Sequence, residues 1–203
     1  KKVSGIITSY IKKKYKVIVL SSAMTGVTND LINKSKKISK NFSSPEYDVL
    51  VSVGEQISCS LIAAKLIDKG YKSRSWLAWQ VPIITEGKHK FSRINKIYKK
   101  EILKYLNLGG IPIIAGFQGI NSQNRITTIG RGGTDASAIM FAKFFNAKKC
   151  IIYTDVDGVY TTDPNKFKNA KKIKVISYEE MLEMASLGAK VMQPHSVQDA
   201  RLN

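Results

Sequence analysis

The sequence predicts an α/β protein, a three-layer αβα sandwich with a mainly parallel central sheet. Short, unbroken runs of β-branched residues, such as 16–22 and 111–117, alternate with longer stretches of helical apolar spacing. Such runs are typical of strands buried on both faces, as in a parallel sheet covered by helices. With 203 residues, 43% of them hydrophobic, the chain can bury one core, so we expect a single domain over residues 1–203.

The first third of the chain predicts three helices around one strand. Apolar residues recur at helical spacing from Val3 to Ile11, with lysines on the opposite face. A β-branched run then predicts the strand, and Gly26 lies in the loop before the next helix. Gly70 marks the end of a long apolar helix. The expected elements are a helix within 1–16, a strand at 16–22, and helices at 27–38 and 48–68.

The remaining two thirds continue the alternation of strands and helices. Ser177 and Glu180 have the spacing of a capping box, which predicts the start of a helix. The expected elements are a strand near 75–79, a hairpin over 81–94, a helix at 95–106, a strand at 111–117, a helix at 134–147, a strand at 149–155, and helices at 177–189 and 196–202.

The chain is strongly basic, with a formal net charge of +18 from 33 Lys plus Arg and 15 Asp plus Glu. Such a charge raises nucleic-acid binding. Only five of the basic residues are Arg, however, and the lysines are scattered, which favours a solvated surface over a polyanion site. The cluster KSKKISK at 34–40 stays open as a basic patch.

Cysteine and histidine usage indicates no metal or disulfide chemistry. Cys59 and Cys150 lie in apolar runs and are interpreted as two buried free thiols in a reducing cytoplasm. The two histidines are far apart and have no zinc-site spacing. No uninterrupted apolar run approaches the ~18 residues of a membrane span, and the start has no secretory pattern. We therefore expect a cytoplasmic protein without a membrane or metal site.

Three polar loops follow predicted strands, at residues 21–29, 116–137 and 154–164. Ligands of open α/β sheets bind at the carboxyl ends of strands, where loops meet helix N-termini. Because all three loops fall at such ends, we expect them to form one site.

The loop GRGGTD at 130–135 has two interpretations. Its three glycines allow positive φ and a close approach of the backbone to an anion, and Arg131 offers a fork for a carboxylate or phosphate. A glycine-rich turn with Thr134 or Asp135 as helix N-cap explains the same residues equally well. Asp135 suits a phosphate site only if it handles a cation, a proton or a lysine.

Two other acidic motifs are ambiguous by themselves. Asp155 and Asp157 precede Gly158, which is more typical of a tight turn than of a nucleotide site, and Tyr160 either stacks on a base or covers the core. Glu55 lies in an otherwise apolar helix, where a carboxylate usually faces solvent; the alternative is that it receives a substrate ammonium.

The motifs taken together resemble a known family. SSAMTGVTN, SVGEQIS, AGFQGI, TTIGRGGTDASA, IYTDVDGVYTTDP and EEMLEMASLGAKVMQPHSV occur in this order. Over nearly the whole chain they resemble the aspartate kinases of the amino acid kinase superfamily. GRGGTD followed by YTDVDGVYTTDP is specific to these enzymes; relatives acting on glutamate, acetylglutamate, carbamate or UMP share the fold without this pair.

The resemblance implies an ATP- and Mg²⁺-dependent phosphorylation of the side-chain carboxylate of L-aspartate to 4-phospho-L-aspartate. This is the first step towards threonine, methionine and, through the diaminopimelate pathway, lysine. It also implies a homo-oligomer. Such a transfer needs positioning and charge neutralisation and no covalent nucleophile.

The resemblance also assigns roles to residues. Glu55 takes the ammonium of aspartate and Arg131 a carboxylate, and Asp135 is the catalytic aspartate that orients a lysine and organises the phosphate site. Magnesium is held by phosphate oxygens and water, with no protein ligand named. The substrate site further comprises Ser22, Thr28, Gly132, Gly133 and Thr134, and the nucleotide site Thr154, Asp155, Tyr160, Asp163 and Lys190.

Some family features are not found in this sequence. The family opens with the loop Lys-Phe-Gly-Gly-Thr-Ser, whose lysine neutralises the transferred phosphate, whereas this sequence begins in the following helix. Relatives continue past residue 203 into ACT domains. We therefore expect a catalytic domain that is incomplete at its amino end and carries no ACT domain. Asn165 stands where the family has Arg, and Lys166 offers only a point charge instead of a bidentate grip.

Two other functions compete with this assignment. One is a sister kinase with another acceptor, against which Glu55 argues because it suits an α-amino acid. The other is a non-catalytic basic binding module, which predicts nucleic-acid binding that weakens steeply with salt.

Overall fold

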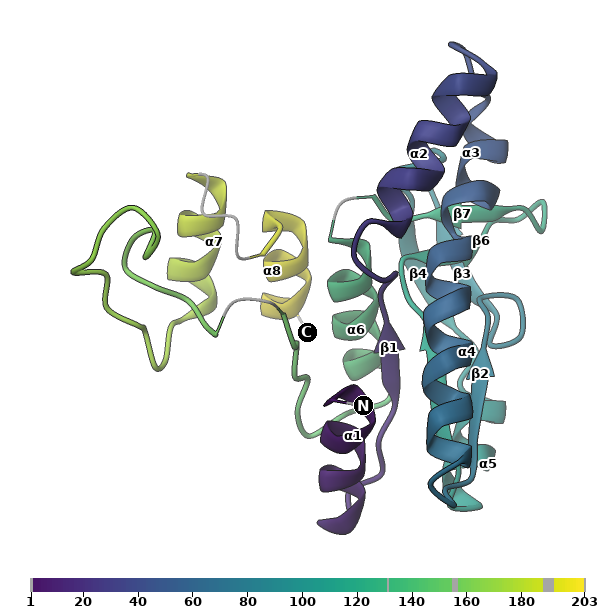
Figure 1. Ribbon diagram of the computed structural model, residues 1–203, viewed down its shortest axis with the longest axis horizontal. Helices are drawn as coiled ribbons and strands as arrows, with labels where there is room; N and C mark the ends of the chain where they lie inside the picture. The colour runs from purple at the N-terminus through teal and green to yellow at the C-terminus, as the bar shows by residue number, and fades with distance from the viewer. Residues whose placement is uncertain (1, 131, 155–156, 188–191, 203) are drawn as a thin grey trace. The chain divides into compact units, whose positions relative to one another are not determined.

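The computed structural model describes residues 2–130, 132–154, 157–187 and 192–202. Contacts divide the chain into two compact units, Lys1–Ser137 and Ala138–Asn203. Each unit is described by itself, with its elements labelled as in Figure 1. The expectation of a single domain stays a prediction.

A three-stranded parallel sheet forms the centre of the first unit. Its order is β1-β5-β2, and β5 pairs with both neighbours in parallel. All five residues of β5 are buried, as the unbroken apolar run predicts for a central strand. The strands are β1 (Val19–Ser21), β2 (Ser73–Trp76) and β5 (Ile111–Ala115).

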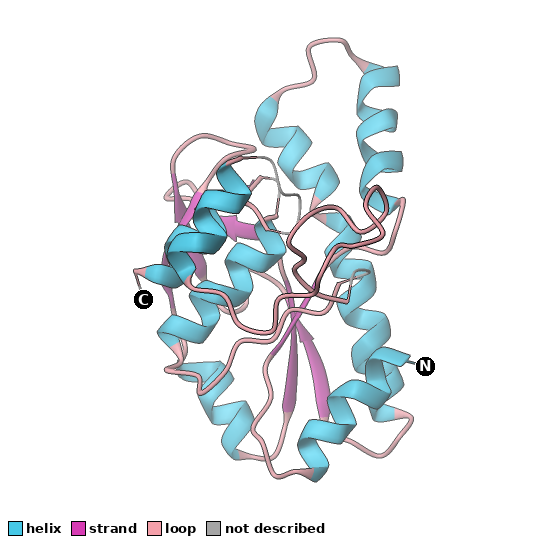
Figure 2. Cartoon of the chain, turned by 90° about the vertical axis from the view of Figure 1, so that its left-hand side faces the viewer, coloured by secondary structure: helices cyan, strands magenta, loops and turns pink. Residues whose placement is uncertain are grey.

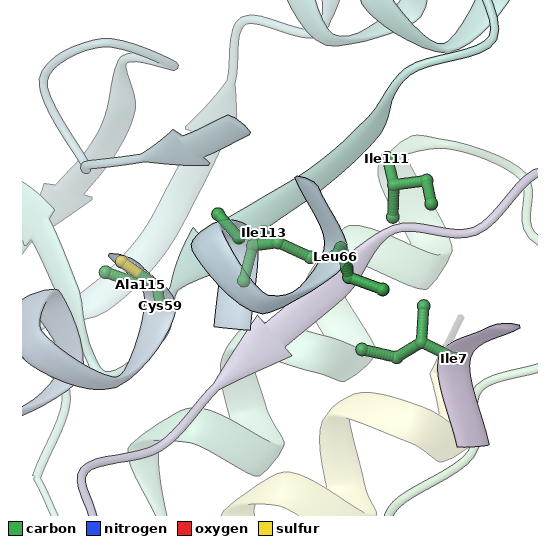
Figure 3. Packing of buried hydrophobic residues seen from close by; sticks show 7 residues of the cluster. Ile7, Cys59, Leu66, Ile111, Ile113 and Ala115 are labelled. Atoms are coloured by element: carbon green, nitrogen blue, oxygen red, sulfur yellow. The ribbon is translucent and has the colours of Figure 1, made fainter. Parts of the chain in front are cut away.

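Helices cover both faces of this sheet. Alternate residues of β5, among them Ile113, pack with Leu66 of α4 (Val53–Ile67) and Ile7 of α1 (Lys2–Lys12), as Figure 3 shows. Trp76 is paired in register with Ile114 and therefore points to the other face, where its ring meets Tyr105 of α5 (Lys100–Asn107) at 5.7 Å. The predicted three-layer α/β arrangement is confirmed in this unit.

A second sheet lies in the same unit, with the order β4-β3-β6-β7. The predicted hairpin is present as the antiparallel pair β3 (Ile83–Glu86) and β4 (Arg93–Ile97). The antiparallel pair β6 (Gln118–Ile120) and β7 (Ile126–Thr128) is a correction, because this segment was expected to be loop. Runs of only three residues, some of them polar, are too short to show the alternation of apolar and polar residues that predicts a strand.

The long helix expected at 48–68 is also corrected, because it forms two helices. α3 (Ser44–Val51) and α4 meet at the buried Ser52, whose hydroxyl donates to the carbonyl of Val49 at 2.9 Å. Such hydrogen bonds from a serine hydroxyl to a carbonyl of the preceding turn compete with the backbone hydrogen bonds of the helix. α2 (Val27–Ile38) has the predicted bounds.

The stretch Ser44–Ile67 is, among the described residues, long and apolar enough by length and composition to cross a membrane, with a mean hydropathy of 1.4 over an 18-residue window. The core helix of a soluble protein has the same composition, and α4 packs along the parallel sheet (Figure 1). The stretch also carries two buried carboxylates, Asp48 and Glu55. Packing in the core therefore accounts for its apolar character.

Two further boundaries differ from the sequence prediction. The helix expected from residue 95 begins at Lys100, because residues up to Ile97 pair in β4. The strand expected at 149–155 is not formed by its described residues 149–154, where Ile151 and Tyr153 are exposed. Cys150 is exposed as well, whereas Cys59 is buried as predicted.

The remaining helices follow the predicted pattern. α6 (Gly133–Phe144) begins in the glycine loop and continues into the second unit. In that unit α7 (Tyr178–Ser186) begins with both hydrogen bonds of the Ser177–Glu180 capping box, and α8 (Pro194–Arg201) follows. Residues 157–177, ahead of α7, are loop and turn apart from an isolated bridge between Tyr160 and Lys172; loops and turns are drawn pink in Figure 2.

Candidate active site

The ends of the two neighbouring strands β1 and β5 position the candidate site. The amide of Gly116, just after β5, donates to the carbonyl of Ser21 at 3.1 Å, so the segments leaving both strands start side by side. Ser22 and Ala23 leave β1 towards α2, whose N-cap Gly26 has φ of +87°. α2 therefore presents free N–H groups and the positive end of its dipole beside the sheet, which favours an anion.

Glu55 is the charged residue at the centre of this arrangement. Its side chain is 4% exposed, and its Oε1 accepts a hydrogen bond from the amide of Ala23 at 3.1 Å. Its Oε2 is buried without a hydrogen-bond partner in the described part of the chain. Burial raises the pKa of Glu55 to about 7 from 4.5. A buried carboxylate with one oxygen to spare is suited to receive a cationic group.

Small residues bring Glu55 close to the loop after β1. A Cβ built on Gly54 would lie 2.7 Å from the Cβ of Ala23 and 3.7 Å from the hydroxyl of Thr28, so only glycine allows α4 to approach this closely. Ser58, one turn further along α4, donates to the carbonyl of Ser22 at 2.5 Å. These contacts place Ser22, Thr28 and Glu55 close together.

The glycine loop lies against the end of β5. Gly130 and Gly132 have φ of +84° and +69°, which explains the choice of glycine at these two positions. A Cβ on Gly133 would lie 2.7 Å from the ring of Phe117, and one on Gly116 would lie 2.7 Å from the methyl group of Thr134. Thr134 therefore lies beside the end of β5, at the same end of the parallel sheet as the loop after β1.

Asp135 lies in the first turn of α6, half-buried. Burial raises the pKa of its carboxyl group above the usual 3.8. No hydrogen bond or ion pair joins Asp135 to another described residue. A carboxylate that is partly desolvated without a protein partner is a candidate for contact with a ligand.

The structure brings the described site residues of the first unit together at one end of the parallel sheet. Ser22, Thr28, Glu55, Gly132, Gly133, Thr134 and Asp135 all lie around the ends of β1 and β5. Arg131, Asp155 and Lys190 lie outside the described residues, so their roles stay predictions. Thr154, Tyr160 and Asp163 belong to the second unit.

In the second unit, Tyr160 and Asp163 lie in a turn-rich segment. The Tyr160 hydroxyl donates to Asp157 at 2.9 Å, and Lys172 forms an ion pair with the same carboxylate at 3.1 Å. The Asp163 side chain accepts from the amide of Asn165 at 2.9 Å and so caps the next turn. The contribution of Tyr160 and Asp163 to nucleotide binding stays a prediction.

A cavity of about 230 Å³ lies elsewhere in the first unit, between α2 and α3. It contains none of the predicted site residues. Lys36 and Lys40, from the basic cluster in the sequence, are among its lining residues, which also include Ile32, Ser35, Ser39, Phe42, Tyr47 and Lys90.

Several residues that build the site were not recognised in the sequence. Gly54 and Gly116 permit the close contacts, and Ser58 fixes the loop after β1. A glycine within an apolar helix is a sequence signal that another backbone approaches closely, and Gly54 directly precedes Glu55. Asp48, the first residue of the helix expected at 48–68, is fully buried, which its sequence neighbours do not indicate.

Replacing Glu55 by Gln is expected to stabilise the chain at pH 8 and to leave its stability nearly unchanged at pH 5. A carboxyl whose pKa is raised from 4.5 to about 7 holds its proton longer in the folded chain than in the unfolded chain, so stability falls as pH rises between these values. The loss above pH 7 amounts to at most about 3 kcal/mol, which a neutral Gln avoids.

Thermal unfolding of both proteins at pH 5 and pH 8 checks this expectation. The exposed Glu46 in the first turn of α3 provides the control variant, Glu46→Gln. A difference between wild type and Glu55→Gln that is the same at both pH values would contradict the raised pKa.

Comparison with known proteins supports the fold and shows the family. A sequence model described as "Amino acid kinase family" matches residues 1–202. Aspartokinases from Rickettsia felis and Geobacillus stearothermophilus are 48% and 47% identical to this chain over 98% of its length, but over only 50% and 49% of their own. The chain thus spans about half the length of these curated relatives.

Solved structures give the same picture. An aspartate kinase from Synechocystis matches 98% of this chain and 33% of its own with a TM-score of 0.84 and 38% identity. Aspartokinase III from E. coli, in complex with aspartate and ADP, matches 90% of this chain and 52% of its own with a TM-score of 0.80 and 27% identity. The α/β fold class is confirmed. Because the family match includes both the glycine loop and the helix that carries Glu55, the chain belongs to the amino acid kinase family.

Proposed function

We propose that this chain is the catalytic domain of an aspartate kinase, which transfers the terminal phosphoryl group of ATP to the side-chain carboxylate of L-aspartate. The observation that carries the proposal is the buried Glu55, whose Oε2 lacks a partner among the described residues at the ends of β1 and β5. An α-ammonium group suits this position, whereas UMP and carbamate offer none. The aspartokinase names of the relatives support aspartate as the acceptor.

The residues around Glu55 can orient an amino-acid acceptor. Glu55 takes the ammonium, and the N-terminal amides of α2 with the hydroxyl of Thr134 favour a carboxylate. Arg131 is proposed as the bidentate partner of that carboxylate. An oxygen of the side-chain carboxylate then attacks the terminal phosphorus of ATP, and the bond to the leaving oxygen of ADP breaks with its electron pair. The residues thus act by positioning, without a covalent intermediate on the protein.

The nucleotide is proposed to contact the second unit, through Thr154, Asp155, Tyr160, Asp163 and Lys190. Among the described residues no three His, Cys, Asp or Glu side chains gather to hold a metal ion. Mg²⁺ is proposed to be carried by phosphate oxygens and water, where it would neutralise charge on the transferred group. Cytoplasmic location and self-association stay predictions, as does the place in amino-acid biosynthesis.

An acceptor assay tests the proposed function. ADP release is measured with ATP and Mg²⁺ plus L-aspartate, L-glutamate or UMP, with hydroxylamine present to trap an acyl phosphate. We expect release and hydroxamate only with aspartate. Hydroxamate with glutamate or phosphorylated UMP would instead assign a sister kinase.

An inactive protein calls for a second step in the same assay. The family's Lys-Phe-Gly-Gly-Thr-Ser segment is then fused ahead of residue 1, and activity that appears on fusion supports the proposal. Continued silence together with RNA binding that weakens steeply with salt would favour the basic binding module.

A further inference from the structure

Asp48 is a fully buried carboxylate in α3 that the proposed reaction does not use. Its side chain is 0% exposed and accepts hydrogen bonds from three other residues. The Thr128 hydroxyl donates to Oδ1 at 2.7 Å, and the Lys90 amide lies 3.1 Å from both carboxylate oxygens. The Nδ1 atom of His89 lies 2.6 Å from Oδ2. The imidazole of His89 thus forms a direct hydrogen bond with this carboxylate.

These bonds join three separate parts of the first unit. Thr128 is the last residue of β7, and His89 and Lys90 form the turn between β3 and β4. The turn has a second attachment to β7, because the amide of Ser92 donates to the carbonyl of Thr128 at 3.0 Å. Asp48 therefore fixes α3, the hairpin turn and the end of β7 against one another.

The attachment continues into the glycine loop. Gly130 follows β7 by two residues, and a Cβ on it would lie 3.0 Å from the carbonyl oxygen of Lys90 and 3.3 Å from the ring of Phe91. The hairpin turn thus lies directly against the start of the loop that leads to Thr134. Any movement of the turn changes the support of this loop.

Asp48 is connected to Glu55 on its other side. α3 passes into α4 through Ser52, whose carbonyl accepts from the buried Gln118 of β6 at 3.1 Å. Glu55 follows Asp48 by seven residues along these two helices. One carboxylate therefore links the helix that carries Glu55 to the strand that leads to Thr134.

From these contacts we propose that Asp48 is a positioning residue of the acceptor site, which holds the glycine loop in register with Glu55. This inference rests on the proposed function, because it takes Glu55 and the glycine loop to bind the same aspartate molecule. Asp48 contacts no reacting atom and acts through the hairpin turn and the end of β7.

The replacement Asp48→Asn tests this role at nearly constant volume. Asn removes the negative charge and replaces one accepting oxygen by an NH₂ group, so the bonds that Oδ2 makes to the hairpin turn change and the loop loses part of its support. A misplacement of about 1 Å costs up to about a hundredfold in rate. We expect the KM for aspartate to rise about tenfold or more, with the KM for ATP changed less than about twofold.

Two further variants separate positioning from stability. Thr128→Val removes one donor, leaves the carboxylate in place, and is expected to raise the KM for aspartate less. Ser73→Ala removes a buried hydrogen bond of 3.1 Å to the carbonyl of Ile111 in the parallel sheet, outside this network. It is expected to lower the melting temperature without changing the KM for aspartate. An unchanged KM for aspartate in folded Asp48→Asn would overturn the proposal.

Amide hydrogen exchange provides a measurement that needs no activity. In Asp48→Asn, and in Thr128→Val if the first variant does not fold, exchange is expected to become faster at residues 87–92 and at 129, 130, 132 and 133. The amides of β1 and β5 should be unaffected. Unchanged exchange in the glycine loop would overturn the proposal. Absence of aspartate-dependent turnover even after the Lys-Phe-Gly-Gly-Thr-Ser segment is fused would instead contradict the proposed function, and exchange would still decide whether Asp48 holds the loop.

Discussion

Replacing Asp135 by Asn is expected to lower turnover about a thousandfold while the protein stays folded. Asp135 lies in the first turn of α6, directly after the glycine loop. It has no hydrogen-bond or ion-pair partner among the described residues, so its carboxylate adds no contact that the fold needs. The proposed role is electrostatic, because an ionised group here can hold a lysine and organise the phosphate site. A neutral amide of the same shape cannot do so.

The replacement Asp135→Asn should lower turnover without lowering the stability of the fold. Burial raises the pKa of Asp135, so the ionised form weakens the folded state above that pKa. Asn removes this cost, and the melting temperature at pH 8 should be equal or higher. Turnover and thermal unfolding are measured together, with Glu101→Gln in the first turn of α5 as control. Turnover close to wild type in Asp135→Asn would remove Asp135 from the catalytic machinery.

Much of the fold could be predicted because its strongest patterns are local. The unbroken run at 111–117 predicts a strand buried on both faces, and Ile113 and Ile114, which face opposite sides of β5, are both fully buried. The capping box at Ser177 likewise predicts a helix start that the structure contains. Both patterns depend on residues that are neighbours in the sequence.

The elements that were missed depend on partners far along the chain. β6 and β7 have only three residues each, and they form strands because they pair with each other and β6 also pairs with Ile84 of β3. The break at Ser52 lies within an apolar stretch, where helical periodicity alone predicts continuity. At residues 149–154 the apolar run predicted a strand, yet no strand pairing forms there in the described part of the chain.

The candidate site shows the same division between local and distant effects. Gly130, Gly132 and Gly133 could be identified because a glycine-rich loop before a helix is a local pattern. The environment of Glu55 could not, since an acid in an apolar helix usually faces solvent. Its burial results from Ala23, which approaches Gly54 from 31 residues earlier in the chain. Asp48 was missed for the same reason, because its donors lie about 40 and 80 residues away.

Replacing Glu55 by Gln is expected to raise the KM for aspartate at least about thirtyfold, with a smaller effect on the KM for ATP. Gln keeps an oxygen that can accept from the Ala23 amide, so the loop after β1 retains its contact. It loses the negative charge that pairs with the ammonium, and truncation of one partner of a buried charged pair is costly. Glu46→Gln, in the exposed first turn of α3, is the matched control.

The pH dependence of aspartate binding separates this role from a structural one. Only ionised Glu55 can pair with an ammonium, and its pKa of about 7 in the unliganded protein leaves it mostly protonated at pH 6. The KM for aspartate of the wild type should therefore fall as pH rises from 6 to 8 and then level off. Pairing with the ammonium favours the ionised form, so aspartate binding near pH 7 should release protons. The Gln variant should show neither effect, because its side chain does not titrate. A wild-type KM that is flat across this range would mean that the buried carboxylate does not bind the acceptor's ammonium group.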